Sequence, residues 1–223
     1  MRFWGMVVFG VLGTAILLSL GIWQLQRLAW KQEVLRAIES KILAPAVEIP
    51  QTVLPDAHSL LPVRAEGRYK GDTVRVLVSQ KIYGAGYRLI TAFELVDGRT
   101  IMLDRGFTSV RLEMPSTPEG RGQVIGNLQW PQEIDSFTPE NDLAANIWFA
   151  RDVARLAEHL KAEPVLLVLR DSSFETEAAT PLPKMTANIP NDHMNYAITW
   201  FSLALIWLGM SGYFLYRSRD PQS

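Results

Sequence analysis

The sequence offers few side chains for metal or nucleophilic chemistry. Its 223 residues contain no cysteine and three histidines, His58, His159 and His193, far apart in the chain. Without thiolates there is no disulfide, iron–sulfur cluster, thiolate zinc or copper site, or cysteine nucleophile. The phosphate-binding loop, the Gly-x-Ser-x-Gly turn and the His-Glu-x-x-His helix are also missing. Because no nucleophile with a base and no pair of poised carboxylates stands out, we predict that the protein is not an enzyme.

Aromatic, basic and amide side chains gather instead in two stretches, residues 20–31 and 188–200. On a helix, residues three, four or seven apart lie on one side. Within the two stretches, such spacings connect the following candidate site residues: Trp23, Gln24, Arg27 and Lys31 in the first, and His193, Tyr196 and Trp200 in the second. Of these side chains, the imidazole of His193 is the one suited to bind a metal.

Two apolar segments must position these residues. Segments 3–23 and 196–216 are each 21 residues long and contain no Asp, Glu, Lys or Arg. A helix of that length rises about 31 Å, enough to cross the ~30 Å hydrocarbon layer of a membrane. We therefore predict transmembrane helices over 3–23 and 196–216. A cleaved signal peptide is the alternative for the first segment, but its apolar stretch exceeds the roughly 7–15 residues of a typical signal core.

Two antiparallel spans place both termini on one side of the membrane and both candidate stretches at one depth. Arginines at positions 2, 217 and 219 point the tails to the cytoplasm. Arg27 and Lys31 favour the opposite orientation, but a long connection can translocate regardless of local charge. No Arg- and Ser-rich presequence precedes the first span. We therefore expect a bacterial inner-membrane protein with cytoplasmic termini and a periplasmic domain over residues 24–195.

The sequence between the two spans predicts a strand-rich domain. The helical pattern of the first span continues to Lys41 as a juxtamembrane helix and stops near Pro45. A short amphipathic helix is expected over 152–161. Strands are expected over 63–69, 74–79, 87–95, 100–103, 123–130 and 165–170. The fold class is therefore a membrane protein of the α+β type, with two transmembrane helices flanking a strand-rich domain that carries a short helix.

Two strand details bear on function. Alternation along 87–95 predicts a strand buried mainly on one face, and Asp97-Gly98 after it predicts a hairpin turn. Arg105-Gly106 follows the next strand and has two interpretations. It either ends the strand with a glycine bulge or takes part in binding.

The charge distribution argues against nucleic acid as a partner. The chain has a formal net charge of −1. The tails hold three arginines and one aspartate, so residues 24–195 carry 19 basic and 22 acidic side chains, a net charge of −3. Nucleic-acid binding requires a basic surface instead.

The chain resembles the surfeit-locus-1 family, the assembly factors for haem–copper cytochrome oxidase. The resemblance covers nearly the whole chain. It rests on the Leu-Gly-x-Trp-Gln-x-x-Arg-x-x-Trp-Lys run at 20–31, on Pro62-Val63, Gly67, Asp97-Gly98 and Arg105-Gly106, and on Asn188, His193, Tyr196-Ala197 and Thr199-Trp200. Asp104 and Phe107 depart from the family, which often has Asn and Trp at these positions.

The resemblance implies a role in oxidase biogenesis, with cytochrome c oxidase subunit I and haem a synthase as partners, and binding of haem a through His193. The haem site requires an oriented imidazole, apolar walls and cations for the propionates. Asn191, Asp192 or Asn195 could orient the ring. The remaining roles fall to Trp23, Gln24, Tyr196 and Trp200 around the haem and to Arg27 and Lys31 for the propionates. Tryptophan, tyrosine, arginine and lysine are also ordinary residents of any membrane interface.

Two alternatives from other functional classes remain. The protein could be a scaffold that stabilises an oxidase assembly intermediate without touching a cofactor. It could also be a membrane-anchored enzyme, although the sequence shows no catalytic constellation.

Overall fold

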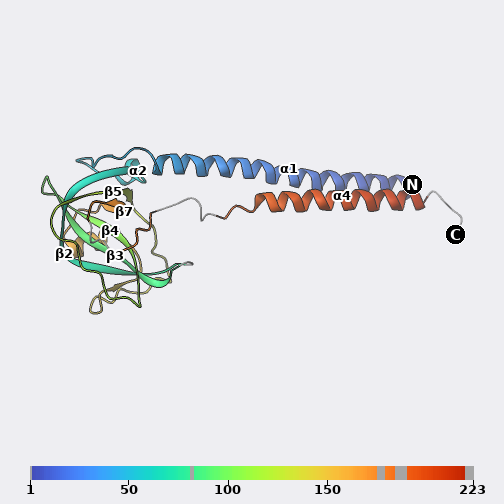
Figure 1. Ribbon diagram of the computed structural model, residues 1–223. Helices are drawn as coiled ribbons and strands as arrows, with labels where there is room; N and C mark the ends of the chain where they lie inside the picture. Colours follow the sequence, from blue (N-terminus) through green and yellow to red (C-terminus); the bar gives the residue numbers. More distant parts are fainter. Residues whose placement is uncertain (1, 81–82, 175–178, 184–189, 219–223) are drawn as a thin grey trace. The chain divides into compact units, whose positions relative to one another are not determined.

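The computed structural model describes residues 2–80, 83–174, 179–183 and 190–218 (Figure 1). The chain forms two compact units, which are described separately. One unit consists of Met1–Glu39 and Thr186–Ser223, and the other is Ser40–Met185.

Two long helices dominate the first unit: α1 (Arg2–Ile42) and α4 (His193–Arg217). Both are long and apolar enough to cross a membrane, and only 11% and 6% of their most apolar windows are buried within the protein. That exposure distinguishes them from core helices of a soluble protein and indicates a membrane protein. With no proline before Pro45, α1 continues unbroken for 41 residues, about 61 Å, and ends at Ile42 as predicted.

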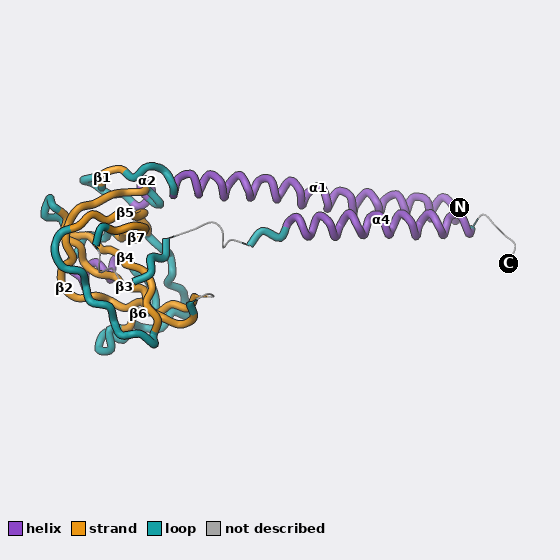
Figure 2. Tube along the Cα trace, in the orientation of Figure 1, coloured by secondary structure: helices purple, strands orange, loops and turns teal. Residues whose placement is uncertain are grey.

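The second unit is a closed five-stranded barrel (Figure 2). Its strands are β2 (Pro62–Gln80), β3 (Gly84–Leu95), β4 (Thr100–Ser109), β5 (Gly122–Gln129) and β7 (Leu166–Ser172). They follow the order β2-β3-β4-β7-β5, and β5 pairs with the first part of β2 to close the ring. Only the β4–β7 pair in this ring is parallel. Two short strands, β1 (Val47–Glu48) and β6 (Ile147–Trp148), add parallel pairs to β2. The predicted fold class is confirmed, but the sequence did not predict closure.

Strand β2 corrects one prediction. The two strands expected over 63–69 and 74–79 form a single strand of 19 residues, whose register with β3 shifts between Lys70 and Thr73. Gly71 lies in this irregularity with a φ of +71°, a conformation that glycine adopts without strain. Strand β2 pairs with β5 over Pro62–Gly67 and with β3 over Gly67–Gln80, so the change of partner falls at Gly67, before the bulge.

Two apolar clusters stabilise the barrel. One contains side chains from all five barrel strands, including Phe93 and Leu167, and forms the interior. The other packs the outer side of the sheet, including Ile90 and Met102, against helix α3 (Val153–Leu160). Strand β3 is therefore buried on both faces along most of its length, and the prediction of a strand buried mainly on one face is wrong. The helix supplies the second cover, which alternation along one strand cannot reveal.

Local sequence patterns predicted the positions of helix α3 and of the turn at Gly98. Helix α3 begins after Asp152, whose carboxylate accepts hydrogen bonds from two backbone N–H groups, and ends at Lys161 in the left-handed conformation. Gly98 has a φ of +89° in the predicted turn between β3 and β4. His159 is exposed on α3, and His58 ends the short helix α2 (Pro55–His58), where its Nδ1 accepts from the backbone N–H of Leu54.

Candidate functional site

The first unit positions the candidate residues by packing α1 against α4. Small residues of α1 receive bulky residues of α4: a Cβ added at Gly13 would lie 2.3 Å from the ring nitrogen of Trp207, and one at Gly21 would lie 2.7 Å from Phe201. The Trp207 Nε1 also donates a hydrogen bond to the carbonyl of Gly10 at 3.2 Å. Close approach at small residues and hydrogen bonds between helices are the means by which membrane helices associate. The contacts run in opposite sequence directions, so the two helices are antiparallel.

At the end of this helix pair, His193 contacts Gln24. The His193 Nδ1 lies 2.8 Å from the Gln24 Oε1. An amide oxygen can only accept a hydrogen bond, so this contact requires the proton on Nδ1 and leaves the lone pair on Nε2. Gln24 is buried and His193 is half-buried. In a neutral imidazole, this contact favours the tautomer with the proton on Nδ1, which leaves Nε2 as the nitrogen that a metal could bind.

A second contact joins the two stretches beside this pair. The Lys31 Nζ donates to the carbonyl of Pro190 at 2.5 Å. Among the described residues, the Asn191 Oδ1 is buried without a hydrogen-bond partner. Helix α4 begins at His193, after Asp192, whose side chain forms no capping hydrogen bond to the described backbone. Neither Asn191 nor Asp192 therefore caps the helix through its side chain, and the group found against His193 is Gln24 of the other helix.

The remaining candidate residues lie around this pair rather than within it. Trp23 and Tyr196 are 54% and 56% exposed, and Trp200 is half-buried. The Arg27 guanidinium lies over the Trp30 ring, 4.1 Å from its centroid. Trp23 precedes Gln24 by about 100° around the helix, which turns its ring away from the side that meets α4. The structure therefore brings Gln24 and His193 together, places Lys31 against Pro190, and leaves the Trp23 and Tyr196 rings exposed. Asn188, part of the carboxy-terminal motif, lies outside the described residues.

The helix pair offers several of the groups that a haem requires. His193 offers a free ring nitrogen with its other nitrogen held, and the buried Asn191 oxygen can accept another hydrogen bond. Arg27 and Lys31 supply cations near by on α1, one helical turn apart. Exposed rings at Trp23 and Tyr196 offer flat apolar surface. The aromatic side chains do not form a closed slot.

In the barrel, Arg105-Gly106 is an internal part of β4. The strand continues to Ser109, so the expected strand end is wrong, but the bulge is confirmed: the β3–β4 register shifts where Arg105 is inserted. Gly106 has a φ of +114°, and an added Cβ would lie 2.1 Å from the carbonyl oxygen of Thr180. Arg105 is fully buried, 5.3 Å from the Tyr69 ring and bonded to the Ser116 carbonyl. The motif is thus a structural device, because Arg105 has no surface on which a ligand could contact it.

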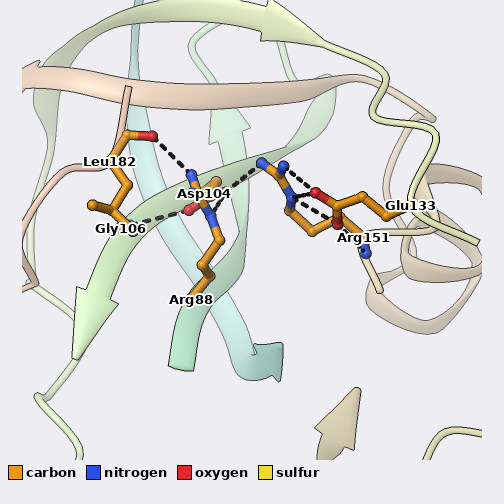
Figure 3. Close-up of polar contacts among 6 residues, drawn as sticks. All are labelled: Arg88, Asp104, Gly106, Glu133, Arg151 and Leu182. Atoms are coloured by element: carbon orange, nitrogen blue, oxygen red, sulfur yellow. Dashed lines mark hydrogen bonds and ion pairs between the residues drawn. The ribbon is translucent and has the colours of Figure 1, made fainter. Parts of the chain in front are cut away.

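Glycine at 106 allows the segment Ala179–Pro183 to cross β4 closely. Phe107 and Thr180 exchange two backbone hydrogen bonds, of 2.7 and 2.9 Å. The Arg88 Nη2 donates to the carbonyl of Leu182 at 3.0 Å (Figure 3). These bonds fix the segment just before the chain continues toward α4, which carries His193.

A buried carboxylate, Asp104, holds this arrangement together (Figure 3). It is fully buried, and its Oδ2 accepts from the Arg88 Nε at 2.7 Å and lies 3.5 Å from the Arg151 Nη1. Its Oδ1 accepts from the backbone N–H of Gly106 at 3.1 Å. No role was predicted for Asp104, although a charged residue within an apolar strand is a signal that such a network exists.

Arg151 extends the network to the protein surface, where it forms several hydrogen bonds with Glu133, including two of 3.0 and 3.1 Å from its Nε. Burial raises the pKa of Glu133, but the hydrogen bonds and charge of Arg151 outweigh it and hold the pKa below its usual range. We call Arg88, Asp104, Glu133 and Arg151 the Asp104 network. It connects the segment at Leu182 with the loop that carries Glu133.

Long apolar helices at the two ends of the chain, with a closed five-stranded barrel between them in the sequence, define a membrane-anchored barrel protein with a polar cluster on its helix pair. The SURF1 family model matches residues 11–205, and the chain belongs to this family. It is 30% identical over 225 residues to the SURF1-like protein of Rickettsia prowazekii, covering 94% of this chain and 88% of the relative. It is 29% identical over 212 residues to Surfeit locus protein 1 of Homo sapiens, covering 83% and 69%. The family is known for cytochrome c oxidase assembly factors, which are generally not enzymes.

Proposed function

We propose that this chain assists cytochrome c oxidase assembly by holding haem a for subunit I, with the His193 Nε2 as a ligand of the haem iron. The contact between the His193 Nδ1 and the Gln24 Oε1 carries this proposal. It holds the imidazole in one orientation through Nδ1 and directs no contact to Nε2, the nitrogen that would bind the iron. Family membership supports the oxidase as the destination.

The other site residues would bind the remainder of the haem. Arg27 and Lys31 would pair with the propionates, while Trp23, Tyr196 and Trp200 would contact the ring and Gln24 would orient the ligand. The bound haem would supply the iron centre and its absorbance. The open arrangement of the rings suits a carrier, because cargo that must pass on to subunit I cannot be enclosed. Haem a synthase would be the donor.

We place this activity at the bacterial inner membrane, with spans over 3–23 and 196–216, both termini in the cytoplasm and residues 24–195 in the periplasm. The tail arginines support this orientation. A reporter active only outside the cytoplasm should work when inserted after Glu119, which is exposed, and fail when fused after Ser223. The reverse pattern would contradict the orientation but not the haem site.

The deciding experiment is an absorption spectrum of detergent-purified protein from cells that make haem a. We expect a Soret band from the wild type. His193→Ala should reduce haem content severalfold and shift the band at unchanged protein level, because alanine is well tolerated in a helix. Arg27→Ala should weaken retention without shifting the band, since propionate pairing does not reach the iron. Tyr196→Phe keeps the ring and should change little.

Two outcomes would count against the carrier proposal. An unaltered spectrum and affinity in His193→Ala would remove His193 as the ligand. Colourless wild-type protein that still co-purifies with subunit I would instead support a cofactor-free scaffold.

A further inference from the structure

The loop between β5 and β6 displays apolar side chains to solvent. Phe137 is 89% exposed, and Ile134 and Leu143 are each 57% exposed. Phe137 is the most exposed large apolar side chain among the described residues, more so than those on the two membrane helices. Single exposed apolar residues are common, but several on one loop indicate an interaction surface.

Hydrogen bonds hold the tip of this loop in one conformation. The Asp135 Oδ1 accepts from the backbone N–H of Phe137 at 2.9 Å and from the Thr138 hydroxyl at 3.0 Å. The Thr138 Oγ1 in turn accepts from the backbone N–H of Asp135 at 2.9 Å. The exposed ring of Phe137 is therefore presented from a turn that is already ordered, which lowers the entropy lost on binding.

Both ends of the loop are fastened to the rest of the barrel. At its start, Glu133 bonds to Arg151 and so joins the Asp104 network (Figure 3). At its end, the Asn146 Nδ2 donates to the carbonyl of Thr73 at 2.8 Å, and the Arg75 Nε donates to the carbonyl of Asn146 at 3.3 Å. The loop is thus a built surface rather than a free connection.

A cavity of about 420 Å³ lies beside the start of the loop. Ile134 lines it together with Trp130 and Val153, and further apolar lining comes from Val53, Pro55 and Val165. The charged lining residues are all acidic: Glu133, Asp152 and Glu163. We call this cavity together with Ile134 and Phe137 the Phe137 surface.

The charge of residues 131–146 indicates which side chains a binding partner would carry. Residues 131–146 contain four acidic side chains, Glu133, Asp135, Glu140 and Asp142, and no Lys or Arg. Glu133 is paired with Arg151, so Asp135, Glu140 and Asp142 supply the acidic charge that the loop presents. A complementary partner carries apolar side chains flanked by Lys or Arg.

We propose that the Phe137 surface docks a protein segment of the oxidase, an apolar residue flanked by basic ones on subunit I. The apolar residue would enter the cavity at Ile134, Phe137 would pack against the partner, and the acidic side chains would contact its basic flanks. The identity of the partner rests on the proposed function, whereas the chemistry of the surface does not.

Photo-crosslinking in cells tests this surface. The full chain carries p-benzoyl-phenylalanine in place of Phe137, and products are probed for subunit I. A matched control carries it in place of Leu112, which is 68% exposed on another loop. We expect a crosslink to subunit I from position 137 that exceeds the control about tenfold. The variant Glu140→Lys should lower it severalfold without changing thermal melting, because the Glu140 side chain is exposed.

Each contrary result has a distinct meaning. No crosslink from position 137, or equal yields from 137 and 112, overturns the surface. If subunit I nevertheless co-purifies with the chain, the proposed function survives that failure. A crosslink to lipid alone, or one that the charge reversal leaves unchanged, overturns the proposed partner chemistry.

Discussion

Two polar clusters in this protein differ in how completely their groups are paired. In the Asp104 network, both arginines contact carboxylates, and the central carboxylate is fully buried. In the helix pair, Gln24 and His193 form one hydrogen bond that involves only one of the two ring nitrogens. Full pairing stabilises one conformation, while an incomplete set leaves a group available to a ligand. We therefore assign the first cluster to stability and propose the second for binding.

Removal of the central charge should have the largest effect. Asp104→Ala leaves Arg88 and Arg151 without their buried carboxylate, and we expect the free energy of unfolding to fall by about 3–5 kcal/mol. Thermal melting in detergent measures this loss. The control, Glu48→Ala, breaks the exposed pair with Arg64 and should cost about 0–1 kcal/mol. Equal losses in the two variants would show that the network contributes no special stability.

The second-largest effect is expected at Gly106, where the segment Ala179–Pro183 passes close to β4. Both Gly106→Ala and Gly98→Ala introduce strain of about 1–3 kcal/mol, since both glycines have positive φ. Only at Gly106 does the new Cβ meet backbone, whereas nothing lies within 4 Å at Gly98. Gly106→Ala should therefore lose a further ~1–3 kcal/mol through the bonds to Thr180 and Leu182. If the two variants melt alike, the crossing segment does not depend on the glycine.

At the helix pair, the expected effect is on ligand affinity. Gln24→Leu keeps the size of the side chain but frees the His193 ring, and we expect haem affinity to fall about 10–100-fold. Haem titration of the purified protein measures the affinity, and thermal melting should change little. A loss of folded protein with unaltered affinity in the remainder would reverse the roles assigned to the two clusters.

The smallest effect is the pH dependence of the Glu133–Arg151 contact. The pKa of Glu133 is lowered in the folded protein, so this pair stabilises the fold above the ordinary glutamate pKa. The contribution should disappear as the pH falls through the lower folded pKa. Melting curves between about pH 6 and pH 3 should therefore show a smaller acid-induced loss in Glu133→Gln than in the wild type. Superimposable pH profiles would rule out a role for this carboxylate in acid sensitivity.

Local patterns in the sequence determined the elements and the kinds of residue at the site. The helical pattern predicted α1 through Lys41, and amphipathic spacing predicted α3 within residues 152–161. Asp97-Gly98 predicted the turn that the structure contains. The seven candidate site residues could be selected because helical spacing is a local property of the chain. Their role in haem binding stays a prediction.

Tertiary structure decided which groups meet. Gln24 and His193 are 169 positions apart, and neither helical face revealed that they would be in contact. Arg88 reaches the Leu182 carbonyl across 94 positions, and the cover on β3 comes from α3, a separate element. Periodicity along one segment specifies which side is apolar but not which other segment covers it. Barrel closure, the Asp104 network and the anchored Phe137 loop all depend on pairing between distant segments, which is why the sequence by itself could not specify them.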